Sequence, residues 1–138
     1  MGELRLLEQL FGQVVIPPAV SREIRPSIPV APGWLESRPL TGPLPTPVVE
    51  AALDEGESEA IALSLELNAD WLLLDELPAR RLAGRLGVAI VGTLGILLLA
   101  KLQGFIPEIR PRVELLKTAN FRVSPALLRD TLRDAGES

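Results

Sequence analysis

The chain has 138 residues, of which 47% are hydrophobic, so we expect a folded domain with a substantial core rather than a disordered segment. It contains no cysteine, histidine or tyrosine, which excludes disulfides, zinc–thiolate sites, thiol nucleophiles and imidazole bases. Its 14 basic and 18 acidic residues give a net charge of −4, so binding to nucleic acid would need a local basic patch or a bound metal ion. Carboxylates are the main functional groups that remain, and they favour hard cations such as Mg²⁺ or Mn²⁺.

The first part of the chain predicts short elements punctuated by proline and glycine. We expect a helix that ends at Gly12, a buried strand over 14–16, a helix opened by Pro18, a proline-rich connector over 26–47 with an edge strand over 34–38, and a short helix from Pro47 to about Asp54. Glu23 lies three residues beyond Val20 and projects near the same helical face, so it is a candidate site residue. An ordinary surface glutamate is the alternative.

The centre of the chain predicts a helix over 57–67 that begins with carboxylates. On a helical wheel Glu57 lies on the same side as Ile61 and Leu65, whereas Glu59 and Glu66 lie on the opposite, polar side. An inward-facing carboxylate is costly unless it has a cation, a metal ion or a shifted pKa. Glu57 is therefore a candidate metal ligand. The alternative is that it simply suits the first turn of a helix, where the helix dipole favours acids.

A short apolar strand over 71–74 follows this helix and ends in two acids, Asp75 and Glu76. Because ligands of open α/β sheets bind beyond the carboxyl ends of the strands, this pair is a further candidate for metal binding. The alternative is that Asp75 caps the next helix, with Pro78 in its first turn. Glu57 and Asp75 together favour a site, because both would converge on one edge of a sheet.

The remaining chain predicts more alternation of helices and strands. We expect a helix over 77–86, an apolar strand over 88–91, a nearly all-apolar helix from Thr93 to Lys101, a helix opened by Pro107 and a last helix capped by Ser124. Arg80 and Arg81 on the first of these helices would either bind nucleic-acid phosphates near the acids or form a solvated basic face. Continuous apolar strands between helices predict an α/β fold, a three-layer α/β/α sandwich around a parallel sheet.

The sequence also predicts the cellular location of the protein. The most apolar window, 88–100, contains two glycines and is too short to span a bilayer. The charged, amphipathic start differs from a signal peptide. We therefore expect a cytoplasmic protein that has no membrane partner.

Several of these segments together resemble a PIN-like domain. The resemblance is carried by Leu10-Phe11-Gly12 with Val15-Ile16-Pro17-Pro18-Ala19-Val20 and Glu23, by Gly56-Glu57-Ser58-Glu59-Ala60-Ile61-Ala62-Leu63, by Leu73-Leu74-Asp75-Glu76, and by Gly92-Thr93-Leu94-Gly95. It covers nearly the whole chain and is closest to the PIN-like proteins often encoded beside toxin–antitoxin modules. We therefore expect a single PIN-like domain over residues 1–138.

The resemblance implies a small nuclease that holds one or two divalent ions, Mg²⁺ or Mn²⁺, in a cluster of acids and cuts single-stranded RNA. Glu57 looks like the acid that opens the family's central helix, and Asp75 like the acid that ends the strand after it. Glu23 matches the family's earlier acid. These three would be the catalytic metal ligands, and Glu76, the counterpart of the later acid, would support them.

One feature departs from the family pattern. The family begins with a strand that carries an aspartate, whereas this chain starts at Met1-Gly2-Glu3, at the equivalent of the first helix, so we expect that strand and its acid to be missing. Two functions are in competition. One is a ribonuclease, the toxin of a pair with an antitoxin-like protein. The other is a catalytically silent PIN-like module that binds a partner protein or its own copy; the apolar helix after Thr93 favours a homo-oligomer.

Overall fold

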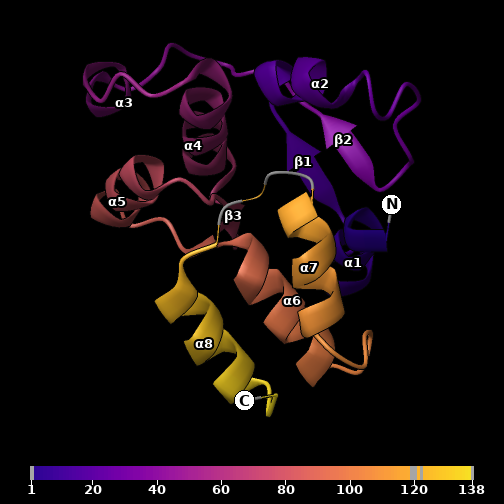
Figure 1. Ribbon diagram of the computed structural model, residues 1–138. Coiled ribbons are helices and arrows are strands. Elements are labelled where there is room, and N and C mark those ends of the chain that lie inside the picture. The colour runs from indigo at the N-terminus through magenta and orange to yellow at the C-terminus, as the bar shows by residue number, and fades with distance from the viewer. Residues whose placement is uncertain (1, 119–120, 122, 138) are drawn as a thin grey trace. The chain divides into compact units, whose positions relative to one another are not determined.

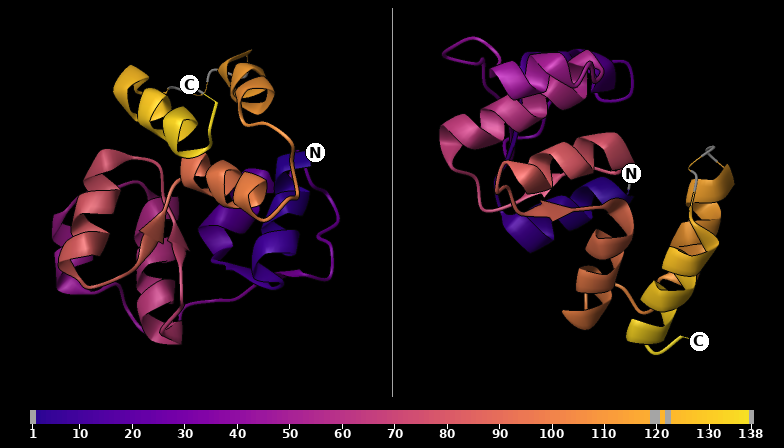
Figure 2. Two further views of the ribbon diagram at one scale, coloured as in Figure 1. Left: turned by 90° about the horizontal axis from the view of Figure 1, so that it is seen from below. Right: turned by 90° about the vertical axis from the view of Figure 1, so that its left-hand side faces the viewer.

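The computed structural model describes residues 2–118, 121 and 123–137, and the chain divides into two compact units. The sheet unit is Phe11–Gly92, and the helical unit is residues 1–10 with 93–138. Figure 1 labels most of the helices and strands, and Figure 2 shows the chain from two further directions. Each unit has its own cluster of buried apolar side chains, so each is stabilised by its own core.

The sheet unit alternates helices with very short strands. In chain order it contains β1 (Val14–Ile16), α2 (Pro18–Ile24), β2 (Leu35–Ser37), α3 (Thr46–Glu50), α4 (Glu55–Leu67), β3 (Leu72–Leu73), α5 (Leu77–Arg85) and β4 (Ile90–Val91). β1 pairs in parallel with β2, and β3 pairs in parallel with β4. The predicted α/β class with parallel strands is therefore confirmed, although the described strands form two separate two-stranded sheets.

Each strand pair has an open edge. The amides of Leu72 in β3 and of Leu74 just after it donate to carbonyls on the β4 side, at 2.9 and 3.0 Å, so the peptide groups of Leu73 point the other way. In β1 the amide of Val14 donates to the Trp34 carbonyl at 2.8 Å, and the peptide groups of Val15 likewise point away from β2. Neither Val15 nor Leu73 is paired with another described strand on that side.

Helix α4 is the longest described helix and lies at the centre of the sheet unit's core. It begins at Glu55, before the predicted start, because the Asp54 side chain caps it by accepting a hydrogen bond from the Glu57 amide at 2.8 Å. The helix before it ends at Glu50, so the prediction that it continues to about Asp54 was wrong. Asn68 in the left-handed conformation ends α4. The core around it is formed by Val48, Ile61, Leu72, Leu74, Ala79, Leu82 and Ala83.

The helical unit contains no strand among its described residues. Its helices are α1 (Gly2–Phe11, whose last residue belongs to the sheet unit), α6 (Thr93–Leu102), α7 (Arg110–Thr118) and α8 (Pro125–Asp134). The predicted cap of α8 is confirmed, because the Ser124 hydroxyl accepts a hydrogen bond from the Leu127 amide at 3.3 Å. Helix α7 starts at Arg110, so the predicted start at Pro107 was wrong. None of the described helices combines the length and apolarity needed to cross a membrane.

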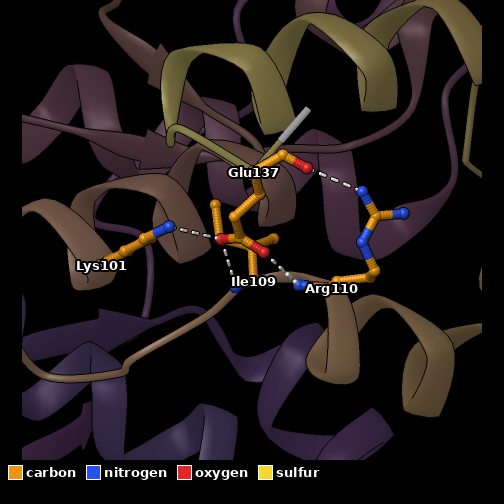
Figure 3. A network of polar contacts seen from close by, with 4 residues as sticks. All are labelled: Lys101, Ile109, Arg110 and Glu137. Atoms are coloured by element: carbon orange, nitrogen blue, oxygen red, sulfur yellow. Dashed lines mark hydrogen bonds and ion pairs between the residues drawn. The ribbon is translucent and has the colours of Figure 1, made fainter.

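One carboxylate joins three helices of this unit (Figure 3). Glu137, just after α8, accepts hydrogen bonds from the Lys101 ammonium group at 2.9 Å, from the Ile109 amide at 2.8 Å and from the Arg110 amide at 3.2 Å. The Arg110 guanidinium also donates to the Glu137 carbonyl at 2.8 Å. Burial disfavours the charged form of Glu137, but these donors outweigh it and hold the pKa of the carboxyl below its ordinary value. The charged side chain therefore stabilises the start of α7.

Candidate functional site

Glu57 lies in the first turn of α4 and is half-buried. Burial raises the pKa of its carboxyl above the ordinary value, and the negative charges of Asp54 and Glu76 raise it further. Asp54 is held beside it as the cap of the same helix. Glu76 lies at the junction of β3 and α5, so an acid from outside α4 also contributes to the raised pKa of Glu57.

The face of α4 that carries Glu57 is mostly buried. Ile61 is 0% exposed and Ser64 is buried, and the Ser64 hydroxyl donates to the Ile61 carbonyl at 2.7 Å. Leu65, which we expected on this face, is 37% exposed and marks its edge. Glu57 thus lies where the apolar face meets solvent, which accounts for a carboxylate that is partly but not wholly removed from water.

Two other acids of α4 have structural roles that the sequence analysis missed. Glu59 was expected on the polar side, but its carboxylate accepts a hydrogen bond from the Ala19 amide at 2.9 Å, at the start of α2. Glu66 accepts from the amide and the hydroxyl of Thr41, both at 2.9 Å, and so anchors the proline-rich connector. The available signal for the first contact was Pro18, because the early amides of a helix need an acceptor from outside it.

Glu23 is exposed on α2, and its carboxylate reaches the first turn of α4. A Cβ atom on Gly56 would lie 2.6 Å from Glu23 Oε1, closer than atoms approach without displacement. Gly56 is buried and directly precedes Glu57 in the chain. The absence of a side chain at Gly56 therefore lets the Glu23 carboxylate lie over the helix end that carries Glu57, a function of this glycine that the sequence analysis did not identify.

Asp75 and Glu76 follow β3 and are both exposed. The residue at the N-cap of α5 is Glu76, without a side-chain capping bond, so the alternative that Asp75 caps this helix was wrong. A Cβ atom on Gly92, just after β4, would lie 3.1 Å from Asp75 Oδ1 and 2.6 Å from Arg80 Nη1. The ends of two paired parallel strands thus bring a carboxylate and a guanidinium together. Arg81, next in the chain, is exposed.

The chemistry of these donors suits a divalent ion. All four predicted ligands, Glu23, Glu57, Asp75 and Glu76, are carboxylates, the donors that Mg²⁺ and Mn²⁺ prefer. Burial, and after it the negative charges of Asp54 and Glu76, raise the pKa of Glu57, and a bound cation would favour the charged form again. Across the described residues, however, no three acids, histidines or cysteines are gathered closely enough to hold a metal ion. The residues fit such an ion in donor type and charge, while their side chains are not arranged around one point.

Comparison with known families decides what this chain is related to. A family model described as DUF3368, a PIN domain, matches residues 1–137. The chain belongs to this PIN-domain family. No curated protein and no solved structure matched it.

Membership confirms the resemblance found in the sequence and gives the site its context. The match extends over both units, from the residues of α1 to those that follow α8. PIN domains are generally nuclease-like and typically use divalent metal ions. In this chain the predicted acids lie on α2, in the first turn of α4 and just after β3.

Proposed function

We propose that this chain is a divalent-metal-dependent endoribonuclease that cuts single-stranded RNA. The observation that carries the proposal is the position of Glu57, a half-buried acid whose pKa is raised first by burial and then by the negative charges of Asp54 and Glu76. Structural acids in proteins are usually surrounded by donors, whereas a half-buried carboxylate with acidic neighbours is typical of functional sites. The family supports the same conclusion, since PIN domains are generally nuclease-like.

Each acid has a defined part in this proposal. Glu23, Glu57 and Asp75 would hold Mg²⁺ or Mn²⁺, with Glu76 supporting them. The ion supplies Lewis acidity, which activates water and stabilises charge on the phosphate. Glu57 binds a proton more readily than an ordinary glutamate, so protons and the cation compete for it and metal binding weakens as pH falls.

The biological setting proposed here follows from the resemblance. The chain would act in the cytoplasm as the toxin of a toxin–antitoxin pair, with an antitoxin-like protein as partner. The open edges of β1 and β3 support the proposed homo-oligomer, because a strand from a second copy would extend either pair. If such a strand joined the two pairs, it would also complete the expected three-layer sandwich.

An RNA cleavage assay tests the enzyme. Wild-type protein with Mn²⁺ should cut a single-stranded RNA, and Glu57→Gln should reduce the rate more than about 100-fold, because loss of a ligand costs at least as much as loss of its supporting groups. Glu50→Gln is the matched control, since Glu50 is an exposed acid at the end of the neighbouring helix α3. Equal cleavage by wild type and Glu57→Gln would remove Glu57 from the site.

A catalytically silent binding module is the second candidate function. The observation in its favour is that no three acids among the described residues come together closely enough to hold a metal. Its PIN-type scaffold would then serve to bind a partner protein or a second copy. Calorimetric titration of wild-type protein with Mn²⁺ separates the two functions: no heat of binding, together with mass that rises with concentration in sedimentation, supports the binding module, and a saturable heat supports the enzyme.

A further inference from the structure

Arg80 occupies an unusual position among the cations of the sheet unit. Helix α5 buries Ala79, Leu82 and Ala83 in the core, and Arg80 flanks this face and is itself half-buried. Arg81 and Arg85 on the same helix are exposed. Of the three arginines of this helix, Arg80 is partly covered by the protein, whereas Arg81 and Arg85 extend into solvent.

The end of the Arg80 side chain lies against Gly92. The ideal Cβ position of Gly92 is 2.6 Å from Arg80 Nη1, and the Leu74 carbonyl is 3.5 Å from the same point. Any side chain at this buried glycine would therefore displace the guanidinium. Asp75 Oδ1 also lies 3.1 Å from that point, so the guanidinium is next to a predicted metal ligand, at the carboxyl ends of the paired strands β3 and β4.

The Arg80 guanidinium has no anionic partner in the described part of the chain. No ion pair within 4.0 Å and no hydrogen bond joins it to another described residue, Asp75 included. The other described arginines that lack such a partner are all exposed: Arg5, Arg25, Arg81, Arg85 and Arg129. A half-buried cation without a counter-ion is costly, and the cost is recovered when an anion binds.

We propose that Arg80 is the phosphate-binding residue of the RNA site, that Gly92 keeps its position open, and that Arg81 takes no part. This inference rests on the proposed function, which it makes more specific. A planar guanidinium can donate two parallel hydrogen bonds to one phosphate, so it suits a phosphodiester better than a lysine does. In an acidic site Arg80 supplies the positive charge that draws an anionic substrate toward Asp75 and Glu57.

Binding of a fluorescent single-stranded RNA in EDTA tests this assignment without cleavage. Fluorescence anisotropy should show about tenfold weaker binding for Arg80→Gln, because a charged hydrogen-bonding pair is lost. The slope of the logarithm of affinity against the logarithm of salt concentration should become shallower by about 0.7, the value for one phosphate contact on a single strand. Arg80→Lys should bind with intermediate affinity, and Gly92→Ala should resemble Arg80→Gln.

Arg81→Gln is the matched control, since it removes the same charge from the next residue of the same helix. It should change affinity less than twofold. Circular dichroism melting of every variant identifies any that fail to fold, and Arg80→Lys keeps the test valid if Arg80→Gln is one of them. Equal losses for Arg80→Gln and Arg81→Gln, or an unchanged salt slope for Arg80→Gln, overturn the assignment.

The possible failures are distinguishable. If the wild type cuts RNA with Mn²⁺ but Arg80→Gln and Arg81→Gln bind RNA equally well, the role of Arg80 is overturned and the nuclease remains. RNA binding that depends on Arg80, without cleavage by the wild type, supports Arg80 and overturns the nuclease. Absence of RNA binding by the wild type in EDTA overturns the role of Arg80, and absence of cleavage with Mn²⁺ as well overturns both.

Discussion

Two glutamates, one in each unit, are held in opposite electrostatic environments. Glu137 in the helical unit is surrounded by donors, an ammonium group and two backbone amides, and its pKa is lowered. Glu57 in the sheet unit is near two other carboxylates, and its pKa is raised. Both side chains are partly or largely withdrawn from solvent, and burial acts to raise the pKa of each; the donors around Glu137 reverse that effect, whereas the acidic neighbours of Glu57 add to it.

The difference separates a structural acid from a candidate functional one. Glu137 satisfies the amides at the start of α7, and its charge is compensated where it lies. At Glu57 a backbone hydrogen bond with Asp54 favours the charged form, but burial and the charges of Asp54 and Glu76 outweigh it, and the pKa stays raised. A site that binds a cation must keep such uncompensated charge, because the ion supplies the compensation. Mutations that remove the charge of one acid or the other test the comparison directly.

The largest expected effect is on metal affinity. Glu57→Gln should weaken Mn²⁺ binding more than about 100-fold, whereas Glu137→Gln should leave it unchanged, because only Glu57 belongs to the proposed ligand set. Isothermal titration calorimetry of the two variants beside wild type measures this. A loss of Mn²⁺ affinity in Glu137→Gln equal to that in Glu57→Gln contradicts the distinction.

The next effect is on stability and has the opposite pattern. Glu137→Ala should lower the free energy of unfolding by about 2 kcal/mol, since it leaves buried donors without an acceptor. Glu57→Gln should leave stability unchanged or raise it slightly, because it removes repulsion. Urea denaturation followed by far-ultraviolet circular dichroism reports both. Glu108→Ala, an exposed acid just before α7, is the control and should change stability by less than about 0.5 kcal/mol.

The two acids should also give opposite contributions to the pH dependence of stability. The pKa of Glu137 is lowered on folding, so its contribution is complete above the ordinary glutamate pKa and is lost as pH falls through the lowered value. The pKa of Glu57 is raised, so its repulsive cost is present at neutral pH and disappears as pH falls through the raised value. Melting temperatures between neutral and acid pH should fall less steeply for Glu137→Gln and more steeply for Glu57→Gln than for wild type.

The smallest effect expected concerns Gly56. Gly56→Ala adds a Cβ atom that displaces the Glu23 carboxylate, which is the end of a flexible side chain, so the gain in helix propensity of up to about 1 kcal/mol should roughly offset the displacement. Mn²⁺ affinity should fall a few-fold. Gly84→Ala in α5 is the control, because nothing lies within 4 Å of its Cβ position. It should stabilise the protein and leave Mn²⁺ binding unchanged; the same titration and denaturation experiments decide.

Local signals in the sequence predicted much of the fold. The order of helices and strands in the sheet unit, the α/β class and the cap at Ser124 follow from periodicity and from proline and glycine positions. The division of the strands into two pairs could not be predicted, because strands of two or three residues carry too little pattern to specify their partners.

The polar contacts were the least predictable part of the structure. Glu59 reaches the Ala19 amide 40 residues away, and Glu137 reaches the Ile109 amide 28 residues away, and no local pattern encodes either contact. A helical wheel placed Glu57 beside apolar residues, but it placed Glu59 in solvent because it ignores the neighbouring helix. The close approaches at Gly56 and Gly92 likewise depend on side chains from other elements.

The backbone groups of Val15 and Leu73, which pair with no described strand, would allow the sheet unit to bind a further strand. An extended peptide that lay along β1 or β3 would find amide and carbonyl groups already aligned to receive it, with no hydrogen bond to another described strand to break. Leu73, which is 42% exposed, would lose its contact with water at the same time. Short synthetic β-strand peptides should therefore raise the melting temperature of this protein, and concentrated solutions should be prone to strand-to-strand association.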